Sequence, residues 1–115
     1  MLTSGLLLLQ GCGERRPAAP QTGGDPERGR ALVRAYGCAT CHLVPGVSGA
    51  RGLAGPPLEG FATRVYIAGT LPNTPDNLVR WVEDPRALVP RTAMPSVGVS
   101  EDDARHIAAY LYTLR

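Results

Sequence analysis

Hydrophobic positions beyond the first two dozen residues recur at helical spacing, and the first helix that they predict runs from residue 25 to Gly37. Leu32, Val33 and Tyr36 lie on one stripe of it. The stretch Asp-Pro-Glu at 25–27 supplies a capping side chain, a proline at the first helical position and an acid in the first turn. Gly37 is suited to the left-handed conformation that ends many helices.

A second helix is predicted after the similar cap at 74–76, Thr-Pro-Asp. Leu78, Trp81 and Val82 form its apolar stripe, and Pro85 is expected to end it.

The third helix is predicted from Ser100 to the end of the chain. Ser100 and Asp103 resemble a capping box, and a helical stripe follows at Ile107, Tyr110, Leu111 and Leu114. No strand pattern and no internal repeat is visible. The fold class predicted is therefore all-α, with three or more helices joined by long loops, including an irregular segment over 43–60 that is rich in glycine and proline. Loops of this length need something to organise them, which favours a large bound cofactor.

Composition supports that expectation. The chain has 115 residues, enough for one domain, and 43% are hydrophobic, yet only 5% are aromatic. Twelve basic and ten acidic residues give a formal charge of +2, which argues against a nucleic-acid-binding protein. No apolar run reaches the roughly 18 residues of a membrane-spanning helix.

The cysteines carry the strongest chemical signal. Cys38 and Cys41 are separated by two residues and followed at once by His42, which is the attachment signature of c-type haem. A thioredoxin-like dithiol would need a strand before the motif, and a structural zinc site would need a fourth ligand. The cysteine and histidine that remain, Cys12 and His106, form no second pair, so haem is the preferred reading.

Met94 is the candidate for the second axial ligand of a haem iron. A methionine sulfur opposite a histidine nitrogen raises the reduction potential. The alternative is that Met94 fills a gap in the core, as most methionines do. Its position in a loop between Pro90 and Pro95 favours the ligand. His106 is the rival ligand, although its place at the edge of the last apolar stripe indicates a surface residue.

With these residues in place, positions 25–115 resemble the class I mono-haem cytochromes c. The resemblance implies an all-α fold wrapped around one covalent haem c with its iron. The porphyrin would take the place of aromatic packing, with apolar side chains around it, namely Leu43, Leu58, Ile67, Leu78 and Trp81.

The same resemblance implies roles for individual residues. The stretch Gly-Pro-Pro-Leu at 55–58 matches a family motif in which the carbonyl of Pro56 accepts a hydrogen bond from His42 and Leu58 packs on the haem. Arg64 falls on the family's arginine near a haem propionate.

Trp81 takes the aromatic position of the helix before the methionine loop, and Thr92 with Met94 matches the Thr-x-Met of that loop. Gly29 and Tyr110 match the point where the first and last helices cross. The segment from 71 to 95 is similar in particular to the cytochrome c domain fused to subunit II of some bacterial haem-copper oxidases.

The N-terminus resembles the end of a bacterial lipoprotein signal. Residues 1–11 are apolar and end in Leu-Gln-Gly before Cys12, which would be acylated. The run is short and no Lys or Arg precedes it, so we expect the true start to lie upstream. An unstructured apolar terminus with an incidental cysteine is the alternative. Residues 12–24 lack apolar periodicity and are predicted to be a flexible linker.

The leading hypothesis is a one-electron carrier, not an enzyme by itself, anchored through Cys12 at the periplasmic or extracytoplasmic face of the cytoplasmic membrane. Its partners would be membrane redox complexes such as a haem-copper oxidase or a quinol-oxidising complex, and no nucleic acid. Two alternatives remain open. The domain could be the electron-transfer subunit of a specific periplasmic redox enzyme, or a haem sensor or peroxidase-like enzyme if Met94 were labile.

Overall fold

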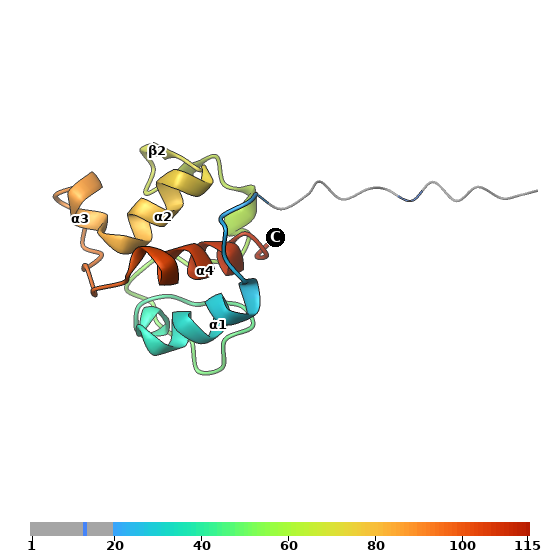
Figure 1. Ribbon diagram of the computed structural model, residues 1–115. Helices are drawn as coiled ribbons and strands as arrows, with labels where there is room; N and C mark the ends of the chain where they lie inside the picture. The colour runs from blue at the N-terminus through green and yellow to red at the C-terminus, as the bar shows by residue number, and fades with distance from the viewer. Residues whose placement is uncertain (1–12, 14–19) are drawn as a thin grey trace, which may run out of the picture.

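The computed structural model describes residue 13 and residues 20–115, and their core is helical (Figure 1). The described residues form four α-helices, two single-turn 3₁₀ segments and a two-stranded hairpin. In chain order these are α1 (Pro26–Ala35), the 3₁₀ turns Cys38–Thr40 and Phe61–Thr63, β1 (Tyr66–Ile67), β2 (Leu71–Pro72), α2 (Pro75–Glu83), α3 (Pro85–Leu88) and α4 (Glu101–Leu111). The three predicted helices are confirmed as α1, α2 and α4.

The capping residues predicted from the sequence lie at the start of all three of these helices. The side chain of Asp25 accepts a hydrogen bond from the Glu27 amide at α1, that of Thr74 from Asn77 at α2, and that of Ser100 from Asp103 at α4. Gly37 follows α1 with φ of 78°, the left-handed value expected of it.

The region around Pro85 differs from the prediction. Pro85 ends α2, but it also opens α3, a single helical turn capped by the side chain of Asp84. Proline is favoured at the first position of a helix because the missing N–H has no partner there in any case. The buried Pro85 therefore marks a turn between two helices, where a loop was expected.

The absence of strands was also a wrong prediction. β1 and β2 pair antiparallel, with Tyr66 opposite Pro72 and Ile67 opposite Leu71. Each strand has only two residues, too few to show an alternating pattern in the sequence.

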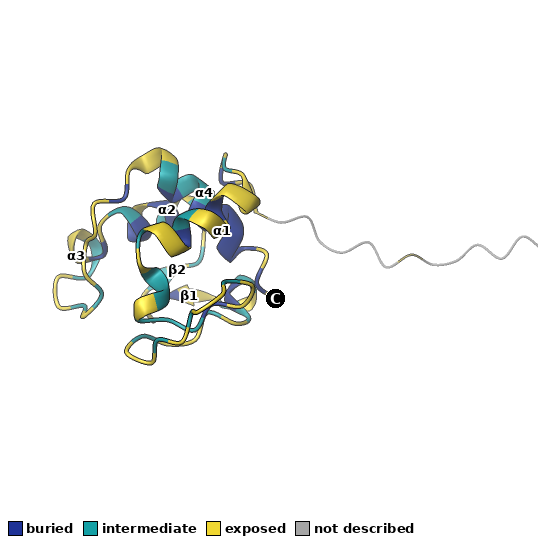
Figure 2. Ribbon diagram, turned by 90° about the horizontal axis from the view of Figure 1, so that it is seen from below, coloured by how far each residue is buried: buried dark blue, intermediate teal, exposed yellow. Residues whose placement is uncertain are grey.

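Helix α4 lies in the middle of the molecule, between α1 on one side and α2 on the other, and its inner face is buried (Figures 1 and 2). The expected crossing of α1 and α4 at Gly29 is confirmed. A methyl group there would overlap the carbonyl oxygen of His106 and lie 3.0 Å from Cβ of Tyr110. Only glycine allows the two helices to come this close.

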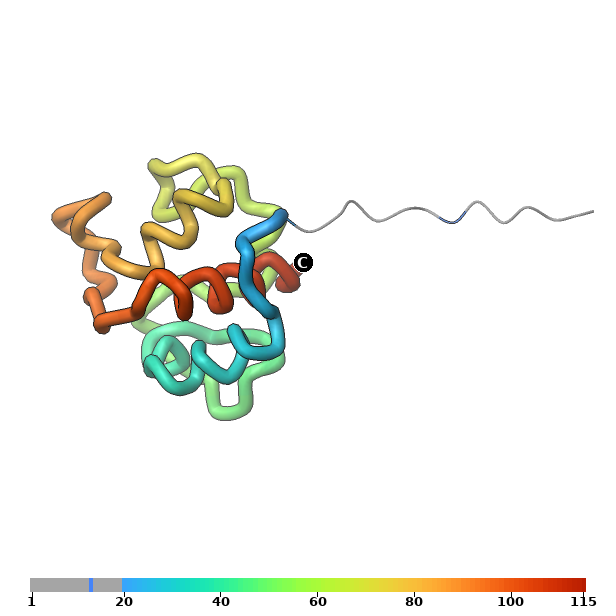
Figure 3. The backbone as a smooth tube through the Cα atoms, in the orientation of Figure 1, coloured from blue at the N-terminus to red at the C-terminus, as the bar shows by residue number. Residues whose placement is uncertain are grey.

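The segment 43–60 contains no helix, as expected, and lies beside α1 (Figure 3). Backbone hydrogen bonds join Gly55 to Cys41 at 2.7 Å and Leu58 to Leu43 at 2.9 Å. Arg30 and Arg34 on α1 donate to carbonyl oxygens of the same segment, at Gly46 and Ser48. The loop is thus fastened to the motif that precedes it and to the first helix.

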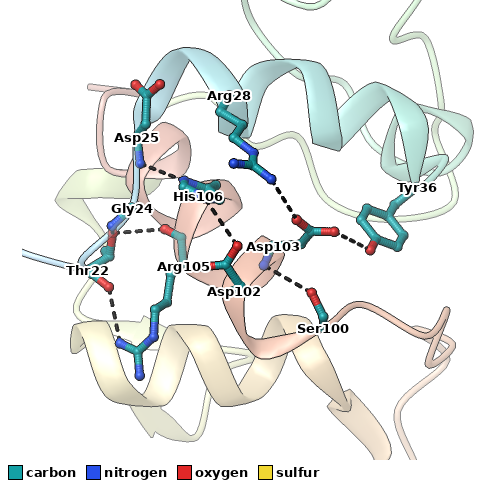
Figure 4. A network of polar contacts seen from close by, with 10 residues as sticks. All are labelled: Thr22, Gly24, Asp25, Arg28, Tyr36, Ser100, Asp102, Asp103, Arg105 and His106. Atoms are coloured by element: carbon teal, nitrogen blue, oxygen red, sulfur yellow. Dashed lines mark hydrogen bonds and ion pairs between the residues drawn. The ribbon is translucent and has the colours of Figure 1, made fainter.

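Residues 22–25 lie against α4 as a short strap (Figure 4). The hydroxyl of the buried Thr22 donates to the carbonyl of Arg105 at 2.9 Å, and the amide of Asp25 donates to Nδ1 of His106 at 2.8 Å. Residues just before the predicted boundary at 25 therefore also pack on α4. The side chain of His106 is only 13% exposed, so its description as a surface residue was wrong.

Within the described part of the chain, no helix is both long and apolar enough to cross a membrane. The predicted signal at 1–11 and the lipidation site Cys12 lie outside the described residues, as does most of the predicted linker.

Candidate functional site

A largely apolar cavity of about 420 Å³ lies inside the helical core. This volume falls within the usual range for cofactor and ligand sites, roughly 300–1,000 Å³. The fold brings all nine residues predicted to bind the cofactor to its wall: Cys38, Cys41, His42, Pro56, Leu58, Arg64, Trp81, Thr92 and Met94. Of the apolar residues expected around the porphyrin, Leu43 does not line this cavity and contributes to a shallow surface hollow instead.

The Cys-x-x-Cys-His motif enters the cavity directly after α1. Gly37 turns the chain, and Cys38 starts a 3₁₀ turn. The carbonyl of Cys38 accepts hydrogen bonds from the amides of Cys41 at 3.2 Å and His42 at 3.0 Å. Burial raises the pKa of the Cys38 thiol. Both thiols are free, and both border the space into which a covalently attached group would fit.

His42 is held in one orientation by the loop that follows it. Its Nδ1 lies 2.7 Å from the carbonyl oxygen of Pro56. A carbonyl can only accept, so Nδ1 carries the proton and the lone pair of the ring is on Nε2. A Cβ at Gly55 would overlap the imidazole and lie 2.8 Å from Nε2. The absence of a side chain at Gly55 therefore leaves the space that the His42 ring occupies.

Arg64 stands at the cavity wall next to an aromatic residue. Its guanidinium lies over the ring of Phe61, 5.5 Å from the ring centre, and donates to the carbonyl of Pro57. The rest of its hydrogen-bonding capacity can serve an anionic group in the cavity.

Helices α2 and α4 supply the apolar wall. Leu78, Trp81 and Val82 come from α2, and Ile107 and Leu111 from α4. Leu78 and Ile107 are almost fully buried, and Trp81 is 9% exposed. This surface suits a flat apolar molecule of large area.

Met94 reaches the cavity from the loop between α3 and α4, and its side chain is partly buried against the core. The hydroxyl of Thr92 accepts a hydrogen bond from the Met94 amide at 3.2 Å, and the Thr92 amide donates to Val89 at 3.0 Å. The loop is thus folded around its threonine. His106, the rival ligand, is not among the lining residues and is occupied by Asp25.

The donor set fits a covalently attached haem. One imidazole nitrogen, one thioether and two thiols border a single apolar cavity, and the space beside His42 is one that a Cβ would fill. In the described part of the chain, no group of three or more His, Cys, Asp or Glu side chains is arranged to hold a metal ion. A zinc site of that kind is therefore not supported.

Sequence reasoning did not identify two contributions to the wall. Phe61, the single phenylalanine of the chain, is buried and stacks on Arg64. Val33 lines the cavity from α1, although the stripe on which it lies was recognised. An apolar stripe shows that a residue is buried, but not which of its neighbours is a cofactor.

Three comparisons with known proteins agree with this site. The protein-family model described as Cytochrome c matches residues 26–115. Cytochrome c oxidase subunit 2 of Alkalihalophilus pseudofirmus is 37% identical over 89 residues, which are 76% of this chain but only 25% of that protein. The structure of cytochrome c2 from Rhodobacter sphaeroides superposes with a TM-score of 0.55 at 24% identity, covering 79% of this chain and 96% of that one, and shows a shared fold.

Proposed function

The chain belongs to the cytochrome c family as a class I mono-haem member with covalent haem c, and on that premise we propose that it carries single electrons with His42 and Met94 as the iron's axial ligands. The observation that supports this proposal most directly is the shared cavity. It receives the free Nε2 of His42, the side chain of Met94 and both cysteine thiols. Haem, when bound, supplies an iron that gains and loses one electron.

The residues of this chain have separate tasks in the proposal. Cys38 and Cys41 provide the two thioether attachments. The bond from Nδ1 of His42 to the Pro56 carbonyl leaves Nε2 as the ligand atom and fixes the direction of the ring, which increases its strength as a ligand. The wall of α2 and α4 excludes water, which lowers the reorganisation that accompanies a change of charge. With His42 and Met94 both bound to it, the iron would have no open position for a substrate, which supports the role of a carrier and not of an enzyme.

We propose the same role for the remaining cavity residues as the family resemblance implies. Arg64 would neutralise a propionate while resting on Phe61, Leu58 and Trp81 would pack against the porphyrin, and Thr92 would hold the methionine loop.

The proposed setting is a respiratory chain. The similarity to a subunit of a cytochrome c oxidase supports a membrane oxidase as the electron acceptor, although that match spans a quarter of the relative's length. Other membrane redox complexes, such as a quinol-oxidising complex, would be donors. A fixed electron-transfer subunit of one periplasmic redox enzyme is the second candidate, because the relative carries its similar segment as part of a larger chain.

We further propose that Cys12 is lipidated and holds the domain at the extracytoplasmic face of the membrane. Support comes from the sequence at 1–12, which resembles a lipoprotein signal. In a host that processes such signals, with the upstream part of the signal supplied, the protein should fractionate with membranes. Cys12→Ser should release it or block its maturation. An unacylated Cys12 in a wholly soluble protein would refute the anchor.

The ligand pair is tested by paired substitutions. Met94→Ala should allow carbon monoxide to bind the reduced haem and should lower the reduction potential, because the sulfur ligand is lost. His106→Ala should leave the low-spin spectrum unchanged, since His106 lies outside the cavity and contacts Asp25. The reverse pattern would assign the sixth ligand to His106.

A further inference from the structure

We propose that Asp84 and Ser96 form a clasp that positions Met94 for its iron ligand site, an inference that rests on the proposed role of Met94. The Ser96 hydroxyl donates to Oδ1 of Asp84 at 2.5 Å. The same oxygen of Asp84 accepts the Ala87 amide at 3.3 Å as the cap of α3. One carboxylate therefore joins the start of α3 to the far side of the methionine loop.

With the clasp, the chain is held on both sides of Met94. Before Met94, the threonine contact folds the chain within the loop. After it, Pro95 has a restricted φ angle and offers no amide hydrogen, and Ser96 is tied to Asp84. A single residue thus separates Met94 from Thr92 on one side and from Ser96 on the other, and the side chains of Thr92 and Ser96 each make a hydrogen bond.

The clasp is attached at the end of a helix, although Asp84 and Ser96 are themselves exposed. Asp84 directly follows α2, and its amide donates to Arg80 in the last turn of that helix at 3.1 Å. The neighbouring Pro85 is buried, and Trp81 and Val82 of the same helix line the cavity. Ser96 is therefore fastened to the helix that forms the cavity wall, so the loop and the wall keep one relative position.

The acceptor is charged at neutral pH. The hydrogen bond from Ser96 is the main cause that holds the pKa of Asp84 below its ordinary value. A hydroxyl bonded to a carboxylate is held more strongly than one bonded to a neutral oxygen.

The test compares carbon monoxide binding to the reduced haem protein. Met94→Ala sets the rate for a fully open site. Ser96→Ala removes the clasp but leaves the cap of α3, and should raise the binding rate about tenfold, the factor expected for losing one hydrogen bond to a carboxylate. The reduction potential should fall in the same variant, because the methionine is detached for part of the time. Ser96→Thr should restore both values.

Two matched controls separate positioning from general destabilisation. Thr22→Ala deletes a hydroxyl that bonds the Arg105 carbonyl, away from the loop, and Ser48→Ala deletes an exposed hydroxyl of the 43–60 loop. Neither should change the carbon monoxide rate or the potential. Asp84→Ala should bind carbon monoxide at least as fast as Ser96→Ala, because it also removes the cap of α3. The double variant should be no faster than Asp84→Ala alone, because the clasp is one interaction shared by the two residues.

The possible results have distinct meanings. If Met94→Ala opens the iron and Ser96→Ala changes nothing, the clasp is refuted and the ligand proposal stands. If Ser96→Ala and Thr22→Ala both raise the rate of carbon monoxide binding, the cause is a general loss of stability and the clasp is again refuted. If Met94→Ala does not open the iron, the ligand proposal and the clasp fall together.

Discussion

At Gly55 a missing side chain lets the backbone pass against the imidazole of His42. We expect Gly55→Ala to push the ring away from its position, because the new methyl group would overlap it and the ring cannot turn without breaking its bond to Pro56. The variant should show a weakened axial ligand, seen as high-spin absorption and a shifted reduction potential. Gly13→Ala, where nothing lies within 4 Å of the added carbon, is the control and should be silent.

Tyr112 should make the domain sensitive to alkali. Burial raises its pKa to about 12 from an ordinary value of 10.0, and its hydroxyl donates to Asn73 at 2.9 Å. Because the folded state holds this proton more tightly than the unfolded chain, the contribution to stability is complete below pH 10 and is lost between about pH 10 and 12. Urea unfolding across that range should show the decline.

Tyr112→Phe should flatten this pH dependence, although the variant starts from a lower stability because Asn73 loses a partner. Tyr66→Phe, at an exposed tyrosine, should keep the steepness of the unchanged protein. Equal slopes for the two variants would show that Tyr112 does not cause the decline.

At the scale of the elements, the closest approach is the crossing of α1 and α4. Gly29→Ala should destabilise the domain by about 1–3 kcal/mol, because overpacking against the His106 carbonyl exceeds the gain in helix propensity. Urea unfolding measures the change. Ala31→Gly, at an exposed position of α1, calibrates the propensity term and should lose about 1 kcal/mol. A stabilised Gly29→Ala variant would contradict the close crossing.

The elements that the sequence predicts well are those with local signals. The caps at Asp25, Thr74 and Ser100 and the glycine at 37 act within a few residues, so α1, α2 and α4 could be placed before the structure was known. The hairpin has two-residue strands, and its turn requires Ala68 at φ of 51°, a conformation that alanine rarely takes. Neither feature leaves a pattern in the sequence.

The contacts of the candidate site likewise divide into those that the sequence predicts and those that it does not. Residues joined by a short motif or a family resemblance were predicted to meet at one cofactor, and the fold brings all nine to one cavity. The role of His106 depends on Asp25, 81 positions away, and the tie of Ser96 to Asp84 crosses from the loop to the end of α2. Such contacts follow from tertiary packing, which a single sequence does not display.

At the scale of the whole molecule, the surface charges bear on how partners are found. Arg51, Arg86 and Arg91 are exposed. The acids at the start of α4 are not free: Glu101 pairs with Arg105, and Asp103 accepts from the Tyr36 hydroxyl at 2.6 Å. The exposed arginines favour a partner with an acidic surface.

Electron delivery should reflect this charge and the proposed anchor. A truncated form without Cys12 should reduce membranes of its own organism with a rate that falls as salt rises, because it relies on long-range attraction. The anchored form should depend less on salt, since the anchor raises the local concentration of partner. Oxygen uptake by membranes supplied with reduced protein measures both.

Membranes that fail to reoxidise either form would contradict an oxidase as acceptor. Reoxidation only by a soluble enzyme that co-purifies with the protein would favour the fixed-subunit alternative.

The strap at 22–25 also decides how this domain can be joined to others. The chain enters along α4, and it does so at the end of the molecule where the C-terminus lies, opposite α3 (Figure 1). A neighbouring module fused to either terminus would attach at this one end and leave the methionine loop uncovered. Such a domain can be part of a longer polypeptide without a change in the face that it presents, and in the oxidase subunit to which it is similar the matching segment is 25% of the chain. In evolutionary terms, such a domain can be fused to different proteins, always through the same end.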